Sequence, residues 1–177
     1  MINVRKHNPV LLNRLKQLFE AGDVAALNKT LNTLSAADFR TAGYLLADNL
    51  LSEYPDLFWK CFLTIVPTRP KAYLGTFLKA LVLIYQKDRE QLNFVALECF
   101  AKEYASPIDS RKCLEYLLPI LETLEEINRL LLIFEPETPK SRAILLLKAG
   151  TPLSYYLFFK TLVSADEEKA TVREYCI

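Results

Sequence analysis

The sequence has little of what enzyme active sites and phosphate-binding loops are built from. Among its 177 residues there is one histidine, His7, and the four glycines are isolated from one another. Catalysis usually needs a group that titrates near neutral pH, and histidine is the commonest such group. A phosphate loop needs clustered glycines, which let backbone amides close on the anion. His7 precedes the first expected helix, and the favoured interpretation is an exposed residue near the N-terminus.

Motifs for nucleophilic and metal chemistry are also missing. The sequence contains no Gly-x-Ser-x-Gly pattern, which would indicate a hydrolase nucleophile. It also contains no Cys-x-x-Cys or His-x-x-x-His pattern, which would indicate a zinc site. The four cysteines, at positions 61, 99, 113 and 176, are widely spaced in apolar contexts and are expected to be small core residues. The acidic cluster at Glu122, Glu125 and Glu126 is better explained as the start of a surface helix than as a carboxylate pair. We therefore expect a protein that is not an enzyme, with no cofactor and no metal.

Long apolar runs are missing as well. The longest, Leu130–Phe134 and Leu153–Phe159, are far shorter than the ~20 residues that span a bilayer. Residues 1–13 lack a signal-peptide pattern, and a net charge of +1 gives no overall attraction to nucleic acid or to an anionic membrane. Cysteines in core positions agree with a reducing compartment. These observations predict a cytoplasmic protein with no membrane association.

The sequence does contain the composition and the capping patterns that are typical of helices. Apolar residues make up 51% of the chain, and few glycines are available for the turns of a β-rich fold. Capping residues stand directly before prolines or open capping boxes at Asn8-Pro9, Ser35, Ser106-Pro107, Thr123, Thr138-Pro139, Thr151-Pro152 and Ser164. These signals predict an all-α fold of about ten short antiparallel helices, at residues 9–20, 24–34, 36–52, 55–66, 70–87, 90–104, 107–118, 124–134, 139–149 and 152–163, with a short eleventh at 165–175.

The expected connections between helices are about two to five residues long, which favours antiparallel neighbours stacked as helical hairpins. One domain covering residues 1–177 is expected from the length. The hairpins would begin near residues 9, 36, 70, 107 and 139, a spacing close to the roughly 33–47 residues of helical repeats. In this respect the chain resembles the HEAT- and armadillo-like α-solenoids over most of its length. An irregular α-α superhelix and a compact multi-helix bundle both remain open.

Residues 57–87 contain basic residues and no acidic one. The basic residues are Lys60, Arg69, Lys71, Lys79 and Lys87, and Trp59, Tyr73, Phe77 and Tyr85 stand among them. One hypothesis is a nucleic-acid interface, with cations on phosphates and aromatic rings stacked on bases. In the alternative, which we favour, the rings belong to the core and the cations form a scattered solvated face. The segment from Glu115 to Glu137 has the opposite charge, with six glutamates and one arginine. The two segments could therefore dock with each other, within one chain or between two chains.

The segment Leu153–Val163 carries aromatic residues around nearly the whole helix. A terminal helix of an array should have a polar outer face, so this one needs a cover. Residues 165–177 could fold back on it as a cap. The alternative is a dimer or partner surface, because tyrosine and phenylalanine are enriched at interfaces. The candidate contact residues are Tyr155, Tyr156, Phe158, Phe159 and Leu162.

These observations support one leading hypothesis and one alternative. The leading hypothesis is a non-enzymatic, helical-repeat-like module for protein–protein interaction or scaffolding, with a protein partner or self-association. The alternative is a nucleic-acid-binding helical array that uses the basic segment 57–87.

Overall fold

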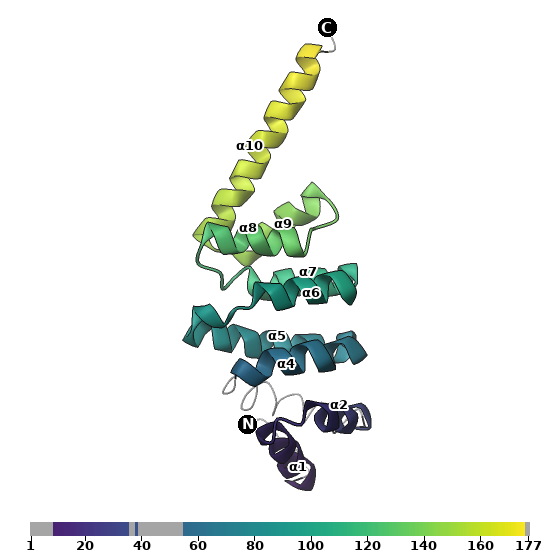
Figure 1. Ribbon diagram of the computed structural model, residues 1–177. Coiled ribbons are helices and arrows are strands. Elements are labelled where there is room, and N and C mark those ends of the chain that lie inside the picture. The colour runs from purple at the N-terminus through teal and green to yellow at the C-terminus, as the bar shows by residue number, and fades with distance from the viewer. Residues whose placement is uncertain (1–8, 36–37, 39–54, 176–177) are drawn as a thin grey trace, which may run out of the picture. The chain divides into compact units, whose positions relative to one another are not determined.

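The computed structural model describes the backbone of residues 9–35, 38 and 55–175, and most of their side chains as far as Val163. Within these residues the protein is all-helical, with nine α-helices, two short 3-10 helices and no strand, which confirms the prediction of an all-α fold (Figure 1). Apart from Asp38, whose amide donates to the predicted cap Ser35 at 3.2 Å, the helix expected at 36–52 lies outside the described residues, as does Asn8. The contacts divide the chain into two compact units, residues 1–105 and 106–177.

Unit 1 contains α1 (Pro9–Glu20), α2 (Val24–Asn32), α4 (Pro55–Ile65), α5 (Pro70–Lys87) and α6 (Phe94–Glu103), with 3-10 helices η2 (Val66–Thr68) and η3 (Arg89–Gln91). Helix α1 packs against α2, α2 against α4, and α4 against both α5 and α6. The two 3-10 helices lie at either end of α5.

The core of unit 1 is aromatic. The ring of Phe62 lies 6.0 Å from those of Phe58 and Phe77 and 5.1 Å from that of Phe100, measured between centroids. These four rings are fully buried. Aromatic pairs at such separations contribute about 0.5–1.5 kcal/mol beyond the burial of their area. This cluster joins α4, α5 and α6 into one packed body.

Unit 2 contains α7 (Pro107–Leu117), α8 (Leu124–Ile133), α9 (Pro139–Ala149) and α10 (Pro152–Tyr175). Helix α7 packs against α9, and α9 packs against α10. The core of this unit is mainly aliphatic, with Leu114, Leu117, Ile127, Leu130, Leu145 and Leu146 among its buried residues.

Most predicted helix starts are confirmed by their capping bonds. Ser106 accepts a hydrogen bond from the Asp109 amide, and Thr123 accepts one from the Glu126 amide, each within a complete capping box. Thr138 caps α9 by accepting from the amide of Ser141 at 3.0 Å. Each bond satisfies an amide that has no partner inside its helix, which is why the cap fixes the start.

The predicted start of the helix at 90–104 is wrong, and so is the prediction of a separate helix at 165–175. Helix α6 begins at Phe94 because Asn93 is its cap, and residues 89–91 form η3 instead. Helix α10 runs without a break to Tyr175, so there is no helix start at Ser164 and no separate eleventh helix (Figure 1). Residues 153–175 contain neither proline nor glycine, so the Ser-x-x-Glu pattern at Ser164 occurs inside a helix that nothing interrupts.

Candidate protein interface

The start of α10 is fixed by local hydrogen bonds. Gly150 ends α9 with a φ of +69°, a left-handed conformation that glycine adopts without strain. The Ser154 amide donates to Thr151 Oγ1 at 3.1 Å, and the Thr151 amide donates to Ser154 Oγ at 2.9 Å. Ser154 is fully buried. These bonds fix the residue at which α10 begins.

The inward side of α10 is narrow. Ser154 and Leu157 are buried, and Phe158 and Thr161 are partly exposed. These four residues are spaced three and four apart and form one stripe of the helix. Because α9 is the main packing partner of α10, this stripe is the side that the unit covers.

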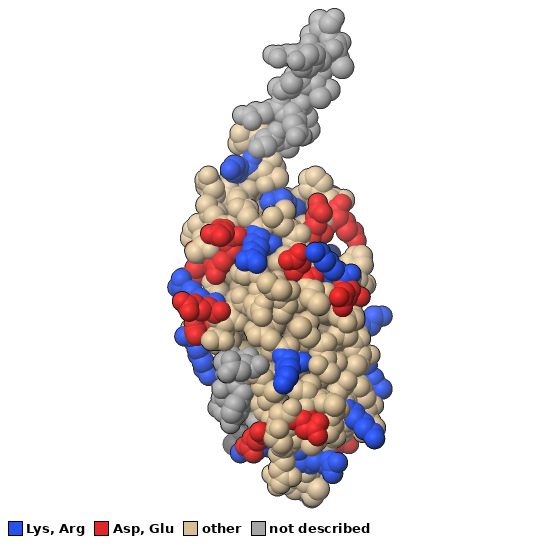
Figure 2. All heavy atoms as spheres, viewed as in Figure 1, with Lys and Arg blue, Asp and Glu red and all other residues tan. Residues whose placement is uncertain are grey.

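The opposite side of α10 is apolar and exposed. It consists of Tyr155, Tyr156, Phe159, Leu162 and Val163, which we call the α10 face; their exposed fractions are 42%, 54%, 61%, 44% and 57%. In Figure 2 the described part of α10, next to the grey atoms, is mostly tan. Four of the five residues expected at a partner surface belong to this face. The fifth, Phe158, is partly buried and its ring lies edge-on to that of Phe159, with centroids 5.3 Å apart.

Val163 was not among the residues expected at the surface. It lies seven residues after Tyr156 and four after Phe159, so the helical period was sufficient to place it there.

The hypothesis that the tail caps this helix does not agree with the structure. A cap needs a turn between the covered helix and the returning chain, and α10 continues through residues 164–175 as a helix. Residues 164–175 therefore extend the axis of α10 and cannot fold back over residues 153–163.

The part of the α9–α10 hairpin that includes the α10 face, residues 139–163, carries only basic charges. Between Pro139 and Val163 there are four basic residues, Lys140, Arg142, Lys148 and Lys160, and no acidic one. On α9, Lys140, Ile144 and Lys148 are exposed at a spacing of four residues, so they share one side of that helix. Beyond Val163, α10 continues with Asp166, Glu167 and Glu168, so the charge along the helix changes sign directly after the α10 face.

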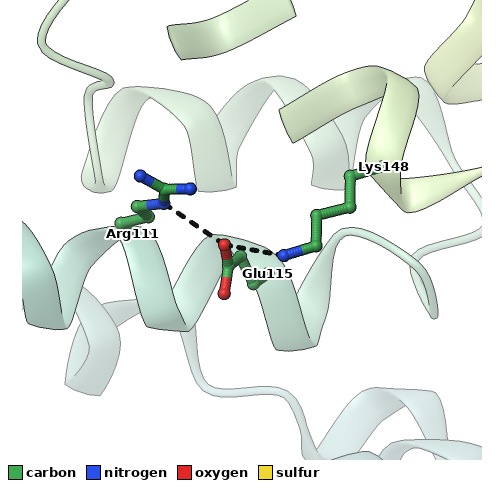
Figure 3. Close-up of polar contacts among 3 residues, drawn as sticks. All are labelled: Arg111, Glu115 and Lys148. Atoms are coloured by element: carbon green, nitrogen blue, oxygen red, sulfur yellow. Dashed lines mark hydrogen bonds and ion pairs between the residues drawn. The ribbon is translucent and has the colours of Figure 1, made fainter. Parts of the chain in front are cut away.

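One of these cations is used to hold the unit together (Figure 3). Lys148 Nζ on α9 lies 3.0 Å from Glu115 Oε1 on α7, and Arg111 Nε lies 3.2 Å from the same oxygen. The Glu115 side chain is only 26% exposed. The hydrogen bond from Lys148, supported by Arg111, lowers the pKa of the Glu115 carboxyl below its usual value although partial burial acts in the other direction. This bridge fixes α9, and through it the base of α10, to α7.

The five basic residues predicted in segment 57–87 are all exposed: Lys60, Arg69, Lys71, Lys79 and Lys87. Tyr73, Phe77 and Tyr85 are buried, and the indole of Trp59 donates a hydrogen bond to the Gln91 carbonyl at 2.9 Å. Tyr73, Phe77 and Tyr85 therefore belong to the interior of unit 1, as the core interpretation predicted, and are not platforms for stacking bases; Trp59 is partly exposed.

The buried cysteines are poor nucleophiles. Burial raises the pKa of Cys61 to about 12, and burial raises that of Cys113 further. At neutral pH both are therefore thiols, and the thiolate is the nucleophilic form. Within the described residues no three potential ligands gather into a metal site. His7 and Cys176 lie outside those residues.

No helix in the described part of the chain has the length and apolarity needed to cross a bilayer. Comparisons with protein-family models, with curated proteins and with solved structures found no match.

Proposed function

We propose that this chain is a non-enzymatic, helical-repeat-like interaction module that presents the α10 face to another protein. The observation that carries the proposal is a single helix side on which five large apolar residues, three of them aromatic, are between 42% and 61% exposed. Scattered single apolar residues are normal on protein surfaces, but a contiguous patch usually marks a contact site.

The chemistry of the α10 face is that of an interface centre. Tyrosine and phenylalanine are enriched where proteins meet, and buried aromatic anchors supply much of the binding energy. Because Thr151 and Ser154 fix the start of α10, the face is held in position before a partner arrives, which reduces the entropy lost on binding.

The non-enzymatic part of the proposal is supported by the environment of the thiols. Cys61 and Cys113 are buried with raised pKa values, so neither is poised for attack on a substrate. Cys61, Cys99 and Cys113 are free thiols, which agrees with a reducing compartment such as the cytoplasm.

The test compares the 177-residue chain with a Phe159→Ser variant as bait for protein partners, alongside light scattering of each protein alone. We expect the unmodified chain to bind a protein partner or itself, and we expect Phe159→Ser to lose that binding while keeping its helical content. A strictly monomeric chain that binds no protein would contradict the proposal.

A second candidate function uses the basic segment. The five exposed cations of residues 57–87 favour it, and because Tyr73, Phe77 and Tyr85 are buried, contact with nucleic acid would rest mainly on phosphates. Such binding weakens steeply as salt rises. The test is a titration of labelled duplex and single-stranded DNA at several salt concentrations, with a Lys71→Glu/Lys79→Glu variant as control. Salt-dependent binding that the variant lacks would support this candidate, and its absence would exclude it.

A further inference from the structure

We draw no further inference here: the strongest candidate, the exposed apolar α10 face at the C-terminal end of unit 2, belongs to the site already described, and nothing in the structure shows what covers it.

Discussion

Helix α4 and the first half of α10 have nearly the same apolar pattern and opposite surroundings. Both are apolar almost all round, with one lysine in the middle, Lys60 or Lys160. Helix α4 packs against α2, α5 and α6, so its phenylalanines are buried. Helix α10 has α9 as its main partner, and Phe159 is 61% exposed. An apolar pattern all round shows that a helix needs cover, and only the other elements decide whether the chain itself supplies it.

The largest expected effect is a direct test of this comparison. Phe62→Ala removes a ring that contacts four others in unit 1, and we expect it to lower the free energy of unfolding by about 3–5 kcal/mol. Phe159→Ala removes a mostly exposed ring and should change the free energy of unfolding of the monomer by less than about 0.5 kcal/mol. Urea denaturation at low protein concentration measures both. A loss of several kcal/mol in Phe159→Ala would mean that the monomer covers the α10 face.

The two helices also show which parts of the fold could be predicted from the sequence. Helices α1, α5 and α9 have the expected bounds to the residue. Their starts could be predicted because a first-turn proline, with a side-chain cap where one is present, is a local signal. The break expected at Ser164 used the same kind of local pattern and is wrong. A capping box can mark a start only where something ends the preceding helix, and residues 153–175 contain no residue that does so.

The residues of the α10 face could be predicted, but their exposure could not. Helical spacing shows that Tyr155, Tyr156 and Phe159 cannot all face inward. Whether the chain returns to cover them depends on contacts that no local pattern contains. The exposure of Leu132 on α8 could not be predicted for a related reason. It stands inside an apolar run, and only its position seven residues after Glu125 indicates that it faces outward.

A smaller effect is expected from the cap that orients α10. Thr151→Ala removes the oxygen that accepts from the Ser154 amide at 3.1 Å, and we expect a loss of about 1 kcal/mol in the free energy of unfolding. Thr64→Ala is the matched control on α4. Thr64 donates to the Lys60 carbonyl inside the helix, where alanine is tolerated, so its effect should stay within about 0.5 kcal/mol. Thermal denaturation compares the pair, and equal losses would contradict the role of Thr151. Thr151→Ser should retain the stability.

The smallest effect concerns the bridge that ties α9, the support of α10, to α7. Lys148 and Arg111 lower the pKa of Glu115 below its ordinary value of 4.5, so the carboxylate stabilises the fold above that pH and the contribution is lost as the pH falls through the lowered value. Glu115→Gln should cost at most about 1 kcal/mol at neutral pH and should flatten the acid limb of a stability-against-pH curve measured by urea denaturation. Glu98→Gln, which removes an ion pair with Lys102 within α6, is the control and should alter that limb less. A limb that Glu115→Gln leaves unchanged would show that the bridge does not contribute to stability.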